Sequence, residues 1–148
     1  MSSGPENRLI RAVHKMLPRT VHAEKMHNPY RGGTADCWYD GDLDVWVEYK
    51  WLASSPSRGV VKPKLSALQV EWLGARKRNG RRVFVAVGHP GGVVVFDTPE
   101  AWEQGIPAKT FTGLNMTRRE FAEWLTEQVV ERQDAENSGK AGSGGKKR

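Results

Sequence analysis

The chain has one cysteine and no long apolar run, and these two features argue against a disulfide-stabilised protein and a membrane-spanning protein. Cys37 is the single cysteine among 148 residues, so no disulfide can form within the chain, as is typical of proteins in a reducing cytosol. No apolar stretch approaches the ~20 residues of a membrane-spanning helix. The opening residues, MSSGPENR, also lack the apolar core of a signal peptide. We therefore expect a cytoplasmic protein without a membrane partner.

Histidine is also scarce, and its spacing does not suggest a metal site. The four histidines, His14, His22, His27 and His89, show no His-x-x-x-His pattern of the kind that a helical zinc site uses. We expect structural or surface roles for them, with His22 or His27 as alternative phosphate contacts.

Positive charge is in excess, and part of it lies in a glycine-rich tail. The formal net charge is +6, and four basic residues, Lys140, Lys146, Lys147 and Arg148, lie in the tail. We expect residues 134–148 to form a disordered basic tail, because they are polar and rich in glycine. Residues 1–133 are long enough to bury one core, so we expect a single domain there.

Within this domain, basic and acidic residues are segregated along the chain. Residues 58–82 contain one acid, Glu71, whereas residues 34–48 are rich in acids. An acidic pocket beside a basic surface suits a site that holds a cation and a phosphate backbone together. The alternative is a solvated charged face. The residues expected to contact nucleic acid are Arg58, Lys62, Lys64, Arg76, Lys77 and Arg78.

The spacing of apolar residues predicts an α/β fold, a mixed β-sheet flanked by helices. Helices are predicted over residues 7–17, 66–79 and 117–130, with a further helical turn over residues 98–102. Strands are predicted over residues 20–26, 35–39, 45–51, 83–88 and 93–97. The last two are almost continuously apolar, which indicates central, covered strands.

Two further segments carry specific expectations. Residues 53–64 are rich in serine, proline, glycine and basic side chains and predict a mobile loop. The apolar face of the helix that follows is predicted to comprise Leu65, Leu68, Trp72 and Ala75.

The segment TADCWYDGDLDVWVEYKWL, residues 34–52, holds five carboxylates and one lysine in what reads as a β-hairpin. Alternation along its second strand puts Glu48 and Lys50 on one face, together with Asp44 and Trp46. With a turn centred on Asp42, Asp36 falls opposite Glu48. Two carboxylates at that separation repel each other, and a divalent cation with oxygen ligands, such as Mg²⁺, relieves the repulsion.

The alternative is a solvated edge strand whose charges form cross-strand ion pairs. Asp40, Asp42 and Asp44 are expected to be turn and surface residues, because aspartate and glycine build such turns. Cys37 is expected to point to the opposite face as a small buried apolar residue. Trp46 shares the Glu48 face, where it is either part of the core or able to stack on a base.

The stretches GGTADCWY and VWVEYKWL resemble the Asp…Glu-x-Lys core of the PD-(D/E)XK nuclease superfamily. Ala35-Asp36 stands where that motif usually has Pro-Asp, and Glu48-Tyr49-Lys50 supplies the Glu-x-Lys. The glycine-rich approach, Arg31-Gly32-Gly33, and the downstream LSALQVEWLGARKRNG are similar to the VRR-NUC branch, including small phage-type members. The resemblance spans residues 6–88.

This resemblance implies a restriction-endonuclease-like core and a set of site residues. Asp36 and Glu48 would bind Mg²⁺, for which Mn²⁺ can substitute, with the carbonyl of Tyr49 as a third ligand. Lys50 would position or activate water, and Gln69 would line the site from the next helix. The family's further acid on the first helix would be Glu6, with Glu24 as an alternative.

The function expected from these residues is a metal-dependent DNA endonuclease. One alternative is a structure-selective Holliday-junction resolvase of the same fold, which would require a homodimer presenting two sites. Others are a non-catalytic DNA-binding protein and an interaction protein that binds through its basic tail. Small size suggests a phage or bacterial accessory protein, which would work in the bacterial host cytoplasm if phage-encoded.

Overall fold

The computed structural model describes residues 4–27 and 32–130. Its elements, in chain order, are α1 (Pro5–Met16), β1 (His22–Lys25), β2 (Cys37–Asp40), β3 (Asp44–Trp51), β4 (Val60–Val61), α2 (Ala67–Arg78), β5 (Arg82–His89), β6 (Gly92–Phe96), α3 (Pro99–Gln104), β7 (Ile106–Pro107), α4 (Ala108–Gly113) and α5 (Arg118–Gln128). The predicted tail, residues 134–148, lies outside the described residues. Within them, no helix has both the length and the apolar character that crossing a membrane requires.

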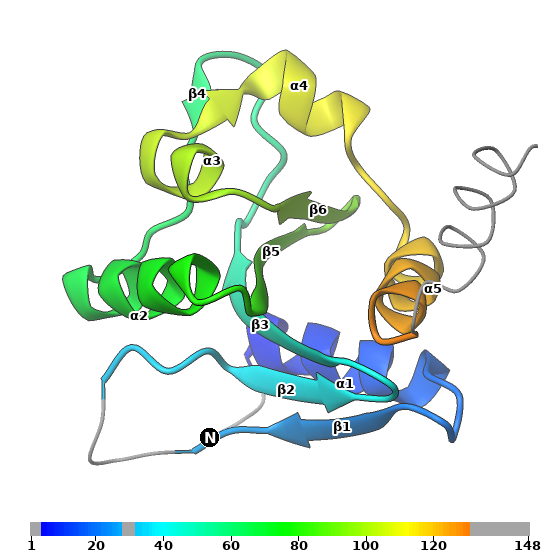
Figure 1. Ribbon diagram of the computed structural model, residues 1–148. Coiled ribbons are helices and arrows are strands. Elements are labelled where there is room, and N and C mark those ends of the chain that lie inside the picture. The colour runs from blue at the N-terminus through cyan, green and yellow to red at the C-terminus, as the bar shows by residue number, and fades with distance from the viewer. Residues whose placement is uncertain (1–3, 28–31, 131–148) are drawn as a thin grey trace, which may run out of the picture.

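Five strands form one mixed sheet in the order β1-β2-β3-β5-β6 (Figure 1). β1, β2 and β3 are antiparallel neighbours, and β5 runs parallel to β3 after the crossover through α2. β6 returns antiparallel to β5, and β4 and β7 form a separate two-stranded ladder. A five-stranded mixed sheet with helices on both faces confirms the predicted α/β class.

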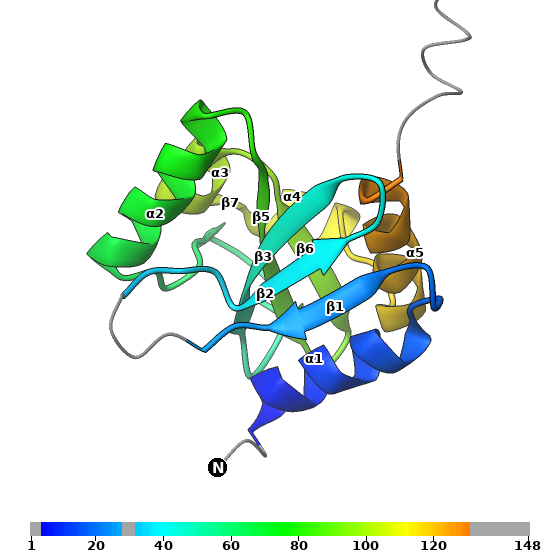
Figure 2. The ribbon, with the colours of Figure 1, turned by 60° about the horizontal axis from the view of Figure 1, so that its bottom comes forward.

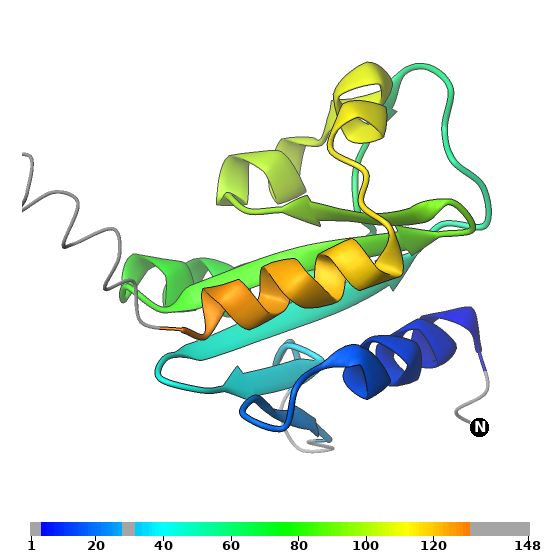
Figure 3. The same cartoon turned by 90° about the vertical axis from the view of Figure 1, so that its right-hand side faces the viewer.

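Two hydrophobic cores lie on opposite faces of the sheet. α1 and α5 cover one face, and α2, α3 and α4 lie on the other (Figures 2 and 3). We call the first the α1–α5 core; its central side chains include Leu9, Val13, Tyr39, Val47, Tyr49, Phe121 and Leu125. We call the second the α2–α4 core; it includes Leu73, Val83, Val85, Val87, Trp102 and Phe111.

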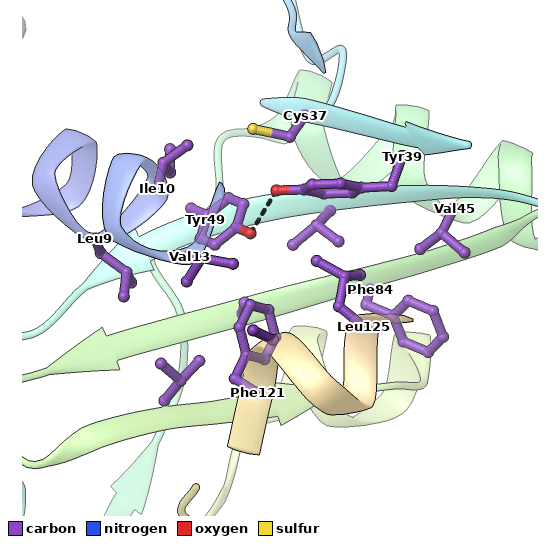
Figure 4. Close-up of a cluster of buried hydrophobic side chains, with 14 of the residues drawn as sticks. Leu9, Ile10, Val13, Cys37, Tyr39, Val45, Tyr49, Phe84, Phe121 and Leu125 are labelled. Carbon is purple, nitrogen blue, oxygen red and sulfur yellow. Dashed lines mark hydrogen bonds between the residues drawn. The ribbon is translucent and has the colours of Figure 1, made fainter. Parts of the chain in front are cut away.

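β3 alternates strictly between these two cores, as its sequence predicts. Val45, Val47 and Tyr49 are buried in the α1–α5 core, so the residues between them face α2. The hydroxyl groups of Tyr39 and Tyr49 lie 2.6 Å apart within this core, and Figure 4 shows the two rings pointing toward one another. His14 contacts the Tyr39 hydroxyl at 2.8 Å, so both buried hydroxyl groups have partners.

The segment predicted as a mobile loop contains regular structure. Its residues Val60–Val61 form β4, which pairs with β7, and Ala108 N–H donates a hydrogen bond to the Gly59 carbonyl. Neither β7 nor α4 was predicted, because two-residue strands and a six-residue helix are too short to show a periodic pattern.

Two details of burial also differ from the predictions. β6 is buried but lies at the edge of the sheet, where Val93 pairs with Met116, so the prediction of two central strands is right for β5 and wrong for β6. Leu65, just before α2, and Trp72 on that helix pack on the α2–α4 core, but Leu68 is 56% exposed and Leu73 is buried instead. Leu68 is displaced outward because the neighbouring Gln69 takes the position that faces the sheet.

Candidate active site

The carboxylates of Asp36 and Glu48 belong to neighbouring strands on the same face of the sheet. Cys37 pairs with Val47, so Asp36, one residue before β2, lies across from Glu48. The Tyr49 N–H donates a 2.9 Å hydrogen bond to Asp36 Oδ2 and holds that carboxylate against β3. The structure therefore brings together the pair of acids that the hairpin register predicts.

Glu48 is the most buried of the charged residues at the candidate site, with 2% of its surface exposed. Its Oε2 accepts a 2.9 Å hydrogen bond from Gln69 Nε2 and lies 3.6 Å from Lys50 Nζ. Its Oε1 is buried with no hydrogen-bond partner among the described residues. Because β3 lies inside the sheet and Glu48 is buried, the interpretation of a solvated edge strand is wrong.

The pKa values of both carboxylates are raised, chiefly by burial. Burial, and secondarily the negative charge of Asp36, raises the pKa of Glu48 to about 8, although Lys50 lowers it. Burial also raises the pKa of Asp36, while the Tyr49 N–H and Lys50 partly offset that rise. Two neighbouring carboxylates with raised pKa values favour the binding of either protons or a cation.

Gln69 reaches Glu48 from the first turn of α2. Its backbone N–H donates to Ser66 Oγ, and its Oε1 accepts from the Ser66 N–H, so the two residues form a capping box. The cap uses Oε1 and leaves Nε2 free to donate to Glu48. One side chain therefore both begins the helix and contacts the candidate site.

The glycine pair before Asp36 packs directly on the same turn of α2. Gly33 has φ +91°, and a Cβ atom there would come within 2.3 Å of the Leu68 carbonyl oxygen. A side chain would therefore clash with the backbone as well as strain it. The segment that leads to Asp36 and the turn that carries Gln69 are in contact because position 33 is glycine.

The first helix brings Glu6 toward the two carboxylates. Burial raises the pKa of Glu6, and the charge of Asp36 adds to the rise. Glu24, the alternative acid, instead contacts His22 at 3.2 Å on β1 and is about half exposed. Lys25 was not singled out in the sequence, yet its charge lowers the pKa of both Asp36 and Glu6.

The donor atoms present fit a hard divalent cation. Among residues 4–27 and 32–130, no three His, Cys, Asp or Glu side chains form a cluster that could enclose a metal ion. Two carboxylates and a carbonyl are the available ligands, and the Tyr49 carbonyl faces the Asp36 edge of β3 because a strand residue's N–H and C=O point the same way. Mg²⁺ suits this incomplete set, since it retains several waters and binds substrate phosphate. The unpartnered Glu48 Oε1 is consistent with such a ligand.

The remaining predictions for this hairpin concern its surface and Cys37. Asp42 and Asp44 are exposed at the turn, as predicted. Cys37 is fully buried in the α1–α5 core, and burial raises the pKa of its thiol to about 12. It therefore has the predicted apolar role.

The predicted phosphate contacts separate into two groups. Lys62 and Lys64 line a cavity of about 330 Å³ together with Lys50, whose ammonium lies 3.6 Å from Glu48 Oε2. Arg76, Lys77 and Arg78 end α2, and Arg78 is roughly 13 Å along the helix axis from Gln69. The Arg76 guanidinium stacks over Trp72, and Lys77 Nζ donates to the Asp97 carbonyl.

Arg58 does not join either group by a described contact. It is exposed in the segment before β4, whose first residue is Val60. Its role in binding nucleic acid stays a prediction.

Comparison with known proteins gives a structural match and no sequence match. No protein-family model and no curated protein sequence matches the chain, so the VRR-NUC branch stays a prediction. The structure is similar to Hjc, a Holliday junction resolvase from the archaeal hyperthermophile Archaeoglobus fulgidus, with a TM-score of 0.51 and 20% sequence identity. The match covers 80% of this chain and 95% of that one. The likeness shows that this chain has the fold of that resolvase, the restriction-endonuclease-like core that we expected.

Proposed function

We propose that this protein is a metal-dependent nuclease that hydrolyses phosphodiester bonds in DNA. The observation that carries the proposal is the Asp36–Glu48 pair: Glu48 is buried, Asp36 is partly buried, and the two lie across from each other with Lys50 beside them. Burying two acids together destabilises a fold unless a cation or protons compensate them. The likeness in fold to a resolvase supports a nuclease with this arrangement.

In this proposal Asp36, Glu48 and the Tyr49 carbonyl hold Mg²⁺, or Mn²⁺ in its place. The metal would supply Lewis acidity to the phosphate and lower the pKa of a bound water. Gln69 keeps Glu48 Oε2 oriented, and the Tyr49 N–H does the same for Asp36 Oδ2.

Lys50 acts on the substrate side of the same site. Its ammonium lies 3.6 Å from Glu48 Oε2 and its side chain is 23% exposed, so it can reach both the buried acid and an incoming phosphate. From there it orients the attacking water and balances the negative charge that grows on the phosphate oxygens. Glu6 adds a further acid near the pair.

A second candidate function is a structure-selective Holliday-junction resolvase. The similarity to an archaeal resolvase over most of both chains favours it. Such an enzyme would present two sites on a homodimer to cut two strands. Mass measurement in solution, with and without a four-way DNA junction, tests this requirement.

The test is cleavage of linear, circular, single-stranded and four-way-junction DNA with magnesium, manganese or a chelator. Glu48→Gln, which keeps the size of the side chain, and Lys50→Ala are compared with Asp44→Ala. Asp44 is a matched control because it is an exposed acid on the same strand and the same face. Metal-dependent cutting that the first two substitutions abolish and the control retains is the expected result.

Other results would favour the remaining interpretations. Binding of DNA without cutting of any form would contradict the nuclease and favour a non-catalytic binding protein. Loss of all DNA affinity on removal of residues 134–148 would instead assign binding to the tail. Preferential cutting of the junction by a dimer would support the resolvase.

A further inference from the structure

We propose that the candidate site takes an unpaired strand of nucleic acid along β3, with one base stacked on Trp38. This inference rests on the proposed nuclease function and names its substrate class: single-stranded DNA or a single-stranded segment of a branched DNA. Three observations carry it. An aromatic pair, Trp38 and Trp46, lies on one side of the carboxylates, and a cavity lined by lysines lies on the other. A further pair of acids, Asp40 and Asp44, lies beyond the tryptophans and limits how far the strand can extend.

The aromatic pair is the next cross-strand pair on the face that carries Asp36 and Glu48. Trp38 lies across from Trp46 in the β2–β3 register, two residues along each strand from the carboxylates. That separation is about 6.6 Å, close to the spacing of adjacent nucleotides in an extended strand. The two indole rings are 6.3 Å apart at their centroids and tilted by 34°, so they are neighbours on this face.

Packing of the hydrophobic cores accounts for Trp46 but not for Trp38. Trp46 packs on the α2–α4 core and meets Trp72 edge-to-face at 5.4 Å. Trp38 is partly buried, yet among the described residues it belongs to neither core; its ring neighbours are Trp46 and the exposed His22. A partly exposed tryptophan that belongs to neither core and lies beside the candidate site suits base stacking, a usual contact of single strands with proteins.

On the other side of the carboxylates, the face continues into the cavity beside Lys50. Lys62 and Lys64 contribute the cations there, and Val61, Pro63 and Val87 contribute apolar walls. Its volume of about 330 Å³ lies at the lower end of the range of small-ligand sites, enough for part of a nucleotide. Phosphates of the strand would lie against the lysines, so that affinity falls as salt rises.

The aromatic pair favours an unpaired strand over a duplex, and a pair of acids limits how far that strand can follow the sheet. In a duplex the base faces are stacked on each other, so an aromatic platform is available only to unpaired bases. Beyond the tryptophans, Asp40 lies across from Asp44, and these acids repel a phosphate backbone. The platform therefore accepts one or two bases before the strand must leave the sheet.

The test measures binding, separately from cleavage. Glu48→Gln protein with magnesium is titrated with a labelled single strand and with the matching duplex, using fluorescence anisotropy. Trp38→Leu keeps an apolar side chain but removes the aromatic face, whereas Trp38→Tyr keeps an aromatic face. We expect the single strand to bind more tightly than the duplex, Leu to weaken single-strand binding by roughly 5- to 100-fold, and Tyr to restore most of it.

A second measurement distinguishes stacking from a structural role of Trp38. Single strands carrying one abasic position at successive sites are titrated against both proteins. At the position that stacks, base removal should weaken binding to the protein with Trp38 and have little further effect on Trp38→Leu. Equal losses in both proteins at every position would overturn the inference, as would equal affinity for single strand and duplex.

The outcomes also separate this inference from the proposed function. Trp38-dependent binding of single strands by a protein that never cuts DNA would keep the stacking platform and contradict the nuclease. Metal-dependent cutting that is indifferent to Trp38 would keep the nuclease and overturn the platform.

Discussion

Gln69 Nε2 lies 2.9 Å from Glu48 Oε2, so the first turn of α2 is hydrogen-bonded to the middle of the sheet. The same side chain closes the capping box with Ser66. The side-chain amide of Gln69 therefore both caps α2 and orients the buried Glu48 carboxylate. Substitutions at Gln69 and Ser66 can separate the capping role from the orienting role.

Gln69→Glu keeps a residue that can close the capping box but replaces the donor to Glu48 with a carboxylate. We expect cutting to fall by about 10- to 100-fold, as for other residues that orient a metal ligand. Ser66→Ala is the matched control, since it removes the cap, costs about 1 kcal/mol of stability and leaves the Gln69–Glu48 contact. Kinetics and thermal melting on both variants check this. Equal cutting by Gln69→Glu and the parent protein would contradict the role given to Gln69.

The raised pKa of Glu48 predicts how stability changes with pH. Folded Glu48 keeps its proton up to about pH 8, whereas the unfolded chain releases it above 4.5. The folded state therefore binds more protons in that window, and the free energy of unfolding falls as pH rises through it. Thermal melts with a chelator at intervals across the window should show this decline. Glu48→Gln should reduce the decline, and an unchanged slope would show that Glu48 is not the buried acid responsible.

Magnesium should reverse this trend if it binds at the carboxylates. A cation competes with the protons on Asp36 and Glu48, so the rise in melting temperature on adding magnesium should grow from about pH 6 to about pH 8. Glu48→Gln should lose most of that rise. A magnesium effect that is equal at both pH values in both proteins would place the metal elsewhere.

Gly33→Ala tests the contact between the segment before Asp36 and α2. The substitution combines strain at φ +91° with a clash against the Leu68 carbonyl, so we expect a loss of about 1–3 kcal/mol and reduced cutting. Gly80→Ala is the control: its φ is +79°, but nothing lies within 4 Å of an added Cβ. Urea unfolding and cleavage assays compare the two. The interpretation fails if both variants lose the same stability and Gly33→Ala cuts normally.

Lys62 and Lys64 are expected to contact the phosphate backbone beside Lys50. Replacing either with alanine should weaken DNA binding and lower the slope of log affinity against log salt by about 1. Lys109→Ala, on the exposed surface of α4, should leave the slope unchanged. Binding titrations over a range of salt concentrations measure the slopes. Identical slopes for all three variants would remove the cavity from the binding surface.

The sequence predicted the arrangement of the hairpin residues of the candidate site, because that arrangement depends on local periodicity. Strand alternation placed Glu48 and Lys50 on one face, and the hairpin turn set Asp36 across from Glu48. Gln69 was expected at the site from the resemblance to the nuclease superfamily. The first two relationships involve short separations along one hairpin, where backbone geometry constrains the side chains.

The predictions that were wrong concern features that depend on contacts between segments distant in the chain. Leu68 was predicted to be buried by helical spacing, but docking of Gly33 and the Gln69–Glu48 hydrogen bond turn that side of α2 outward. β6 lies at the edge of the sheet although it is as apolar as a central strand. It can be apolar there because α3 and α4 cover one of its faces and Met116 pairs with Val93 on its outer side. The ladder of β4 and β7 joins segments more than 40 residues apart, which no local pattern reveals.

By itself the sequence determined the class of the fold and which side chains share the face of β3, because period-two alternation and helical spacing follow from backbone geometry alone. Among the described residues, the tertiary structure alone decided that Glu48 is buried with Oε1 unpartnered, that Lys62 rather than Arg78 lines the cavity with Lys50, and that Trp38 belongs to neither core. Each depends on the order of strands and on which helix covers which face, and these are set by packing between segments distant in the chain.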